Sequence, residues 1–208
     1  MEYSKEFKEA LSNFTPKEKD KLIFRLLRKD KILSQKLYFE LIENKTTDEK
    51  RQEIEEHIAE KVEYYAKMSN SKYYLTLIRG ISAGITLHTK VTTDKFGEVF
   101  LNIFLVNEIL KSRKEMFYKQ GFEKNYKLYL YLINKIFRAL TLTLKLDEDY
   151  YLDLDTILKE TLESLKQNDD MVKLCINNGL DFNYFQTENI PEDIANQIKE
   201  LKAEGYLR

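Results

Sequence analysis

Apolar residues recur at helical spacing along most of this chain. Near its start, Tyr3, Phe7, Ala10, Leu11 and Phe14 follow one another at intervals of four, three, one and three residues, which is the repeat of one face of an α-helix. Similar stripes lie within residues 22–27, 32–42, 54–66, 99–110 and 154–165. The pattern therefore predicts an all-α protein with about nine helices.

Several of the predicted helices carry recognisable start and stop signals. In the stretch TPKE, Thr15 can cap a helix, Pro16 suits its first turn, and Glu18 can return a hydrogen bond to the cap. Together these residues predict a capping box. The other predicted starts are Asp30, Thr47 or Asp48, Thr93 or Asp94, and Pro191, and the predicted ends are Gly121, the NNG stretch at 177–179 and Gly205. Only two prolines and six glycines interrupt the chain, which argues against an all-β fold.

Residues 73–89 have a different character, because Arg79 is the only full charge among them. A helix that is apolar on nearly all sides is normally buried, so we expect this one in the core. Gly80 and Gly84 would each lower helix propensity by about 1 kcal/mol, which predicts a close crossing with a neighbouring helix. The alternative is a β-hairpin, since Thr, Ile and Val favour strands. A phosphate loop lacks both its glycine pattern and a following Lys-Ser/Thr.

Short connections between the predicted helices favour antiparallel packing of sequential helices. The segment 73–89 and the next helix, predicted to run to about residue 118, are the most apolar, so they are expected to be two buried central helices. A HEAT- or armadillo-like stack and an irregular bundle both satisfy this plan. We expect a single all-helical domain over 1–208, with a possible subdivision into N-terminal helices (1–70), core helices (71–178) and a C-terminal appendage (179–208).

Two stretches, LSNFTPKEKDKLIFRLLRKDKILSQKLYFELIE (11–43) and YYLTLIRGISAGITLHTKVTTDKFGEVFLNIFL (73–105), resemble an uncharacterised all-helical bacterial protein family. Its members have a short helical lead and then two long apolar helices joined by a Gly/Thr/Lys-type turn. The resemblance rests on the apolar pattern and the basic residues within 11–105 and includes no catalytic motif. It implies helices over 73–105 and transfers no activity.

Composition excludes several classes of protein. Hydrophobic residues make up 43% and charged residues 33% of the chain, which is typical of a globular protein. The net charge of −1 provides no overall field for a nucleic acid or a membrane surface. Cys175 is the only cysteine, so an intramolecular disulfide and a cysteine-based zinc site are excluded. The first residues, MEYSKEFKEAL, contain charges throughout and no apolar signal core, which favours the cytoplasm.

The best candidate metal ligands are Glu53, His57 and Glu60, which would share one face of a helix. They match neither HExxH nor the Glu-x-x-His of di-iron bundles, so solvated surface charge is the simpler interpretation. All-helical nucleotide pyrophosphohydrolases resemble this chain in size and helicity and hold magnesium with paired Glu-x-x-Glu and Glu-x-x-Asp motifs. Glu53 with Glu56, and Glu60 with Glu63, fit the first motif; the second is missing, because the central helices offer only Glu98 and Glu108.

Charge is distributed unevenly along the sequence. Residues 111–145 carry nine basic and two acidic residues, residues 147–170 carry two basic and nine acidic residues, and 17–36 is also basic. A stripe predicted to face outward contains Lys127, Tyr131, Asn134, Arg138 and Lys145, and Arg79 is expected to reach an acid or the surface. This stripe could follow a phosphate backbone with tyrosine stacking, or it could lie against the acidic helix that follows it.

None of these residue patterns matches a known catalytic motif in full. The first hypothesis is therefore a non-enzymatic helical interaction or scaffold protein. Its expected partner is an unknown protein, and no cofactor and no membrane association are expected. The residues expected to form the interaction surface are Lys127, Tyr131, Asn134, Arg138, Lys145 and Arg79. The second hypothesis is a metal-dependent nucleotide hydrolase, and the third is binding of a nucleic acid by 17–36 and the basic stripe. His88 is expected to cap the end of its helix and Cys175 to be a small core residue.

Overall fold

The computed structural model describes residues 2–208, and every regular element in this part of the chain is helical. The α-helices are α1 (Lys5–Ser12), α2 (Pro16–Leu27), α3 (Lys31–Leu41), α4 (Thr47–Ala66), α5 (Ser71–Thr92), α6 (Lys95–Ser112), α7 (Lys114–Thr143), α8 (Tyr151–Lys166), α9 (Asp169–Asn177) and α10 (Ile194–Ala203). Short 3₁₀ turns occupy Glu148–Tyr150, Phe182–Phe185 and Thr187–Asn189. The prediction of an all-α, multihelical protein is confirmed.

The chain divides into two compact units. One contains the residues up to Lys45 and the short segment Lys90–Thr92; the other contains Thr46–Thr89 and Thr93–Arg208. We call α1–α3 the N-terminal helices and the second unit the bundle. The boundary near residue 45 falls earlier in the chain than the subdivision at residue 70 considered from the sequence.

Local signals determine where the N-terminal helices begin. Before α2, the Thr15 amide donates to the Glu18 carboxylate at 2.9 Å, and the Glu18 amide donates to the Thr15 hydroxyl at 3.4 Å, which is the predicted capping box. Before α3, the Asp30 carboxylate accepts from the Leu33 amide at 3.0 Å. These bonds satisfy amides that have no partner inside their helix, so they fix where each helix begins.

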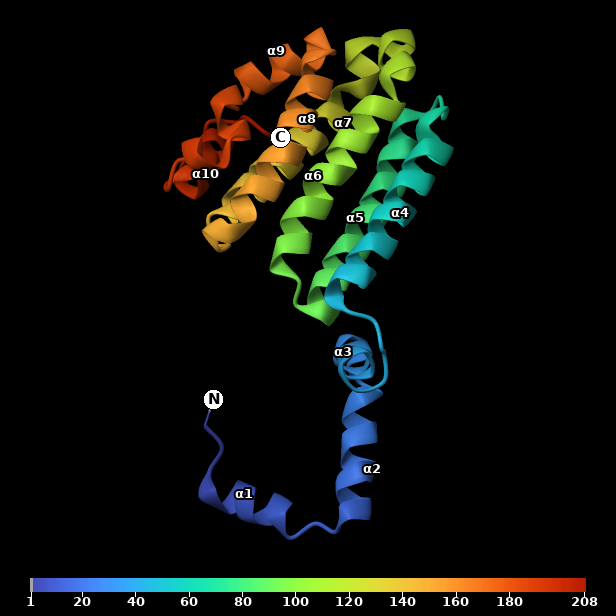
Figure 1. Cartoon of the computed structure of the whole chain (residues 1–208), viewed down its shortest axis with the longest axis vertical. Coiled ribbons are helices and arrows are strands. Elements are labelled where there is room, and N and C mark those ends of the chain that lie inside the picture. The colour runs from blue at the N-terminus through green and yellow to red at the C-terminus, as the bar shows by residue number, and fades with distance from the viewer. Residues whose placement is uncertain (1) are drawn as a thin grey trace. The chain divides into compact units, whose positions relative to one another are not determined.

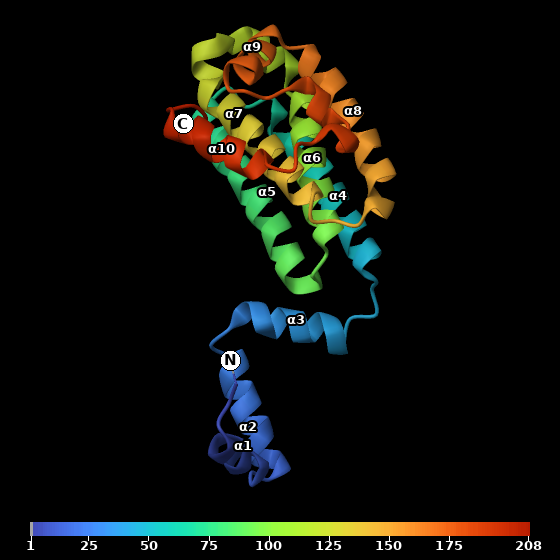
Figure 2. The same ribbon diagram turned by 90° about the vertical axis from the view of Figure 1, so that its left-hand side faces the viewer.

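In the bundle, α6 is the central helix. It packs against α4, α7 and α8 (Figure 1), and most of its residues from Gly97 to Leu110 are buried. In addition, α9 packs against α7 and α8, and α10 packs against α7. Figure 2 shows α9 and α10 on the side of the bundle that faces the viewer. The bundle therefore surrounds one apolar rod, as the pattern at 99–110 predicted.

The segment 73–89 lies in α5, which excludes the hairpin, but α5 is buried on one side only. Tyr74 and Ile78 are fully buried, whereas Gly80 and Gly84 are exposed. A Cβ atom added at either glycine would meet nothing within 4 Å. Within the bundle no helix therefore crosses α5 closely at the glycines, and the expectation of two buried central helices is wrong. The absence of charge misled the prediction, because an uncharged surface of small residues is compatible with solvent.

The junction between α6 and α7 also differs from the prediction. The sequence suggested one helix to about residue 118 that ends at Gly121, but α6 ends at Ser112 and α7 begins at Lys114. Arg113 separates them, because its backbone leaves the helical region with φ of −99° and ψ of 6°; its side chain donates to the carbonyls of Ala66 and Met68. Gly121 instead allows a kink inside α7, where its φ of 72° suits a residue without Cβ.

The acidic helix α8 packs chiefly against α6, and not against the basic α7 that precedes it. The sequence suggested that acidic residues of α8 neutralise the basic residues of α7, but the acid of another helix that pairs with α7 comes from α6. Arg138 of α7 pairs with Glu98 of α6 at 2.7 Å, and Lys111 of α6 pairs with Glu160 of α8 at 3.1 Å.

Most predicted helix ends lie within a few residues of the observed ones. Asp94 caps α6, one of the two predicted possibilities, whereas α4 is capped by Thr46 in place of Thr47 or Asp48. The helix expected to open at Pro191 begins at Ile194. Gly179 and Gly205 follow helix ends with φ of 75° and 98°, the left-handed conformation that favours glycine there.

Candidate functional site

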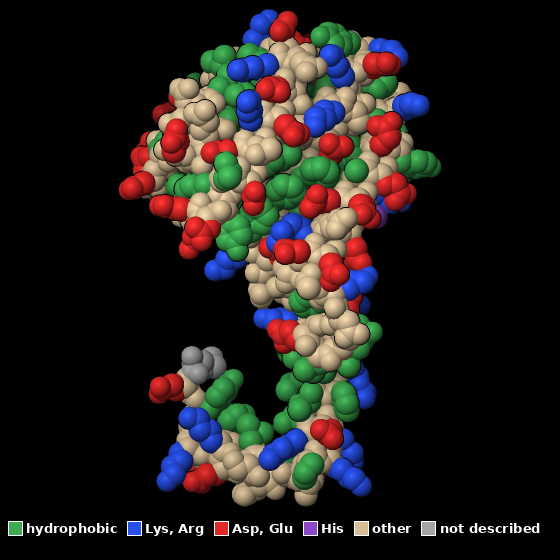
Figure 3. Space-filling model, viewed as in Figure 1, with side chains coloured by type: hydrophobic (Ala, Val, Ile, Leu, Met, Phe, Trp, Pro, Cys, Tyr) green, Lys and Arg blue, Asp and Glu red, His purple; other side chains and the backbone are tan. Residues whose placement is uncertain are grey.

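Large apolar side chains lie on the surface of the N-terminal helices. No residue within 2–45 is buried. The exposed large hydrophobic residues of this segment are Tyr3, Phe7, Phe14, Ile23, Phe24, Leu26, Ile32, Leu33, Tyr38, Leu41 and Ile42. Figure 3 shows such side chains gathered beside Lys and Arg on these helices. Covering one side chain of this size contributes about 1.5–3 kcal/mol, so these helices gain stability when another surface covers them.

The bundle has an apolar groove on its surface between α4 and α5. Its lining residues are Ile54, His57, Ile58, Lys61 and Tyr65 from α4, and Thr76, Leu77, Gly80, Ile81 and Gly84 from α5. The groove has a volume of about 290 Å³. Because the two glycines have no side chain, the backbone of α5 is accessible along one wall. The same exposed side of α5 carries Tyr73 and Leu87, which are 54% and 40% exposed.

Acidic residues border this groove on the outer side of α4. The helix contains seven Asp and Glu residues and three Lys and Arg residues. Glu60 is exposed and lies beside the groove residue His57, which is three residues before it in the helix. Glu60 contacts Lys61 at 3.6 Å with 73% of its side chain exposed, so this pair contributes little to stability. The groove therefore has a mainly apolar lining that includes Lys61, and the outer side of α4 beside it is predominantly acidic.

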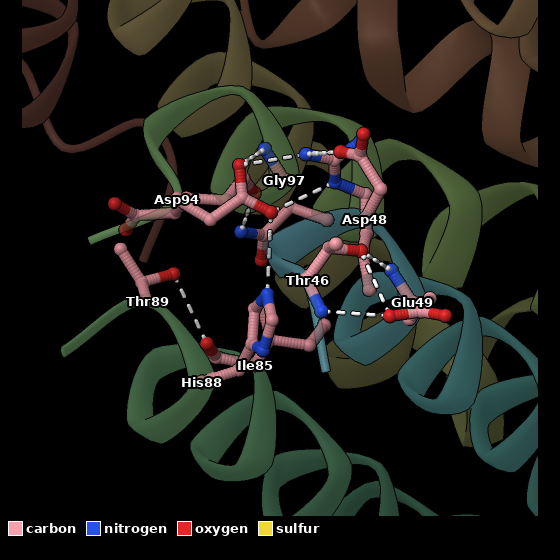
Figure 4. A network of polar contacts seen from close by, with 11 residues as sticks. Thr46, Asp48, Glu49, Ile85, His88, Thr89, Asp94 and Gly97 are labelled. Carbon is pink, nitrogen blue, oxygen red and sulfur yellow. Dashed lines mark hydrogen bonds and ion pairs between the residues drawn. The ribbon is translucent and has the colours of Figure 1, made fainter. Parts of the chain in front are cut away.

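A buried polar network lies where α4 begins and where α5 turns into α6 (Figure 4). Arg51 donates two hydrogen bonds to the carboxylate of Asp94, at 2.8 and 3.0 Å. The same carboxylate accepts from the Gly97 amide at 2.8 Å, and Nε2 of His88 lies 3.3 Å from it. Asp94 therefore caps α6 and also joins the first turn of α4 to the end of α5.

Asp94 stays ionised because these contacts favour its charged form. Burial alone would raise its pKa, but the hydrogen bonds from His88, Arg51 and Gly97 and the charge of Arg51 lower the pKa to about 2. Bidentate arginine–carboxylate pairs are among the stronger polar contacts in proteins. With both side chains of the His88–Asp94 pair only 4% exposed, the network is a structural clamp that holds one end of the groove.

Arg113 forms a second buried polar centre at the other end of α4. Its guanidinium donates to the carbonyls of Ala66 and Met68 at 2.9 Å and lies 3.9 Å from the centre of the Tyr74 ring. Burial lowers the pKa of Arg113 below its usual value. The side chain satisfies carbonyls that the end of α4 leaves without helical partners. The sequence analysis missed this role, because it placed Arg113 in the middle of a helix.

The predicted metal ligands lie on the exposed side of α4. Glu53 pairs with Lys50 at 3.4 Å, His57 lines the groove, and Glu60 points to solvent beside Lys61. Within residues 2–208, no three His, Cys, Asp or Glu side chains gather in a way that could hold a metal ion. Glu98, which the hydrolase hypothesis would need, is occupied by Arg138.

Only part of the predicted basic stripe is exposed to solvent. Lys127 and Lys145 are exposed, but the Tyr131 hydroxyl bonds to Ser82 at 2.6 Å and Asn134 donates to the Leu207 carbonyl at 3.3 Å. Arg138 pairs with Glu98. Arg79 is exposed, as one of the two expected possibilities, and its guanidinium lies 5.7 Å from the Tyr131 ring centre.

Other individual residues have structural roles. Nε2 of His88 lies 3.3 Å from the carboxylate of Asp94. Lys135 of α7 donates to Asn102 at 2.8 Å, and burial lowers its pKa to about 8. Cys175 is buried, as expected for a small core residue, and burial raises the pKa of its thiol to about 12. A thiol with so high a pKa is a poor nucleophile at neutral pH.

Comparison with known proteins finds no family model, no curated protein sequence and no solved structure that matches this chain. The resemblance noted over residues 11–105 therefore stays a prediction, and the surfaces described above are the only basis for assigning a function. Across residues 2–208, none of the helices is both long enough and apolar enough to cross a bilayer.

Proposed function

We propose that this chain is a helical protein-interaction protein whose N-terminal helices bind a protein partner. One observation carries the proposal: α1–α3 begin at well-formed caps, yet none of their residues is buried. They contain eight, 12 and 11 residues, and isolated helices of that length are marginal in water. Helices of this kind become stable when their apolar side docks on another surface.

The chemistry of these helices favours a protein as the partner. An amphipathic helix lying in an apolar groove is a common mode of protein recognition, with anchors at i, i+3, i+4 and i+7. On α2, Ile23, Leu26 and Leu27 occupy positions i, i+3 and i+4 of this pattern, and Leu22 lies beside them one turn before Leu26. Residues 2–45 contain eleven Lys and Arg and eight Asp and Glu residues, a mixed charge that fits a protein surface better than a phosphate backbone. We further propose that the protein acts in the cytoplasm, as the sequence predicts.

The test is capture of a partner by the full chain. A tagged wild-type chain, the variant Ile23→Gln/Leu26→Gln and the variant Lys17→Gln/Lys21→Gln are expressed in the source cell and recovered with nuclease treatment. Glutamine has at least the helix propensity of isoleucine, so the first variant removes apolar anchors while α2 keeps its propensity. We expect a defined protein to accompany the wild type and the lysine variant and to be lost, by at least tenfold, from the apolar variant.

Two results would contradict the proposal. Recovery of the same proteins by all three chains would show that the apolar side of α2 recognises nothing. Loss of the bound material from the lysine variant alone, or on nuclease treatment, would instead identify nucleic acid as the partner, because phosphate contacts depend on charge and not on Ile23 or Leu26.

A further inference from the structure

We propose that the groove between α4 and α5 is the docking site for α2 of a second copy of this chain, so that two copies exchange their N-terminal helices. This inference rests on the proposed function, because it names the partner that the N-terminal helices bind. It concerns two surfaces that the same sequence encodes, one apolar and basic and the other apolar and acidic.

The groove has the shape that a helix needs. It extends along α4 from Ile54 to Tyr65, which is about 17 Å at 1.5 Å per residue. The helix α2 has 12 residues and is therefore about 18 Å long. Along the α5 wall, Gly80 and Gly84 are accessible on the groove side. Glycines let a helix approach the backbone more closely than the usual 8–10 Å between helix axes.

The glycines also need an explanation that the isolated bundle does not provide. Each one lowers the stability of an exposed helix interior by about 1 kcal/mol relative to alanine. Neither glycine has a positive φ, and an added Cβ would meet no atom at either position. The conformation of the chain therefore does not demand glycine here. A helix lying across this wall would demand it.

The charges of the two surfaces are opposite. The helix α2 carries four basic and two acidic residues, and α4 carries seven acidic and three basic residues. On α2, Arg25 lies next to the apolar position Leu22 by helical spacing. A helix seated in the groove would thus place its basic flank near the exposed carboxylates of α4, such as Glu60. Such complementarity sets the orientation of a partner and excludes wrong ones.

A second copy of the chain would cover both the apolar side of α2 and the groove at once. In a dimer with two-fold symmetry, the contact of one helix with one groove is repeated in the other direction, and the assembly closes. Exchange of an identical element between protomers is a low-cost route to such a dimer. Each copy would cover the apolar side of α2 and the bare backbone of α5.

The first experiment measures the mass of the full chain by sedimentation over a wide range of protein concentrations. We expect a dimer for the wild type, which weakens as salt is added because the contacting charges are exposed. The variant Gly84→Arg fills the groove and adds a charge of the same sign as α2. Arginine is a good helix former, and nothing lies within 4 Å of the new Cβ, so the bundle folds. We expect its dissociation constant to rise at least tenfold.

Matched controls and a mixing experiment assign the contact. Ala203→Arg adds the same side chain at an exposed position of α10, and we expect it to dimerise as the wild type does. The variant Ile23→Gln/Leu26→Gln has an intact groove and a defective α2, whereas Gly84→Arg has the opposite defect. Each alone should be monomeric, and a mixture should form a heterodimer with one intact contact.

The results separate this inference from the proposed function. A wild-type chain that stays monomeric at every concentration, or a Gly84→Arg variant that dimerises with wild-type affinity, overturns the exchange of helices. If the chain is monomeric but the apolar variant still loses a captured protein, the proposed function stands and the partner is a different protein. If the chain is monomeric and no variant loses a partner, both fail.

Discussion

The two helices α2 and α4 begin with the same local signal and have different surroundings. Both start with a capping box, Thr15 with Glu18 and Thr46 with Glu49. Yet α4 buries Ile58, Val62 and Ala66, and α2 buries nothing. The comparison shows that a cap fixes where a helix starts. The stability of the helix depends on a neighbouring surface that covers its apolar side. In the bundle α6 provides that surface, and for α2 we propose another molecule.

The largest expected effect concerns the clamp at the start of the bundle. In Gly97→Ala, the new Cβ would collide with the Asp94 carboxylate and the Arg51 side chain. Because the buried pair must move apart, we expect the free energy of unfolding of the bundle to fall by about 3 kcal/mol. Urea unfolding followed by circular dichroism measures this. An unchanged midpoint would show that the clamp does not hold the bundle together.

A smaller loss is expected when the charge of Asp94 is removed. Asp94→Asn keeps the shape of the side chain but weakens its charge-assisted bonds with Arg51, so we expect a loss of about 2 kcal/mol at pH 7. The pKa of Asp94 is about 2 when folded and 3.8 in its unperturbed state. A lowered pKa stabilises the fold above the unfolded value, and this contribution disappears as the pH falls from about 4 to 2.

The measurement is a set of urea unfolding curves for the wild type and Asp94→Asn between pH 7 and pH 3. The difference between them should be constant down to about pH 4 and then shrink. A difference that does not depend on pH over this range would mean that the charge of Asp94 contributes nothing.

The two capping boxes provide a matched pair of variants, and the expected loss of stability is of intermediate size. Thr46→Ala removes the cap of α4, and we expect the bundle to lose about 1 kcal/mol. Thr15→Ala removes the equivalent cap of α2 and should leave the unfolding of the bundle unchanged while it weakens association of the chain. Thermal unfolding and sedimentation of both variants test this. Equal losses of bundle stability in the two variants would contradict the division between the units.

The smallest expected effect is a gain in the stability of the bundle, in contrast to the losses above. Gly84→Ala should raise the stability of the bundle by about 0.5–1 kcal/mol, since alanine favours the helix and its Cβ meets nothing within 4 Å. The same change at the buried Gly97 is strongly destabilising. A loss of stability in Gly84→Ala at low protein concentration would show that another part of the chain packs on this glycine.

The sequence predicts helices and caps well in this protein because those signals are local. The box at Thr15 and the cap at Thr93 or Asp94 needed only a few neighbouring residues to predict. Burial depends on which surfaces meet, so Gly80 and Gly84 were assigned to the core although they are exposed. Arg113 could not be recognised for the same reason, since the carbonyls that it binds come from residues 66 and 68, far along the chain.

For the candidate site, the sequence predicted Glu53, His57 and Glu60 of α4 as metal ligands, and of these only His57 lines the groove. The spacing of Glu53, His57 and Glu60 correctly placed them along one side of a helix, and the metal hypothesis followed from their side chains alone. Only the structure shows that the neighbouring side of α4 joins α5 in an apolar groove. The basic character of residues 17–36 was visible at once, but the surface that it matches required the fold.

Hydrogen exchange of the full chain at several protein concentrations tests most directly whether the N-terminal helices depend on a second molecule. The amides of α6 should be protected equally at every concentration, because the core of the bundle covers them. We predict that the amides of α2 gain protection as the concentration rises and lose it in Gly84→Arg. Protection of α2 that is independent of concentration and unchanged in that variant would contradict the account.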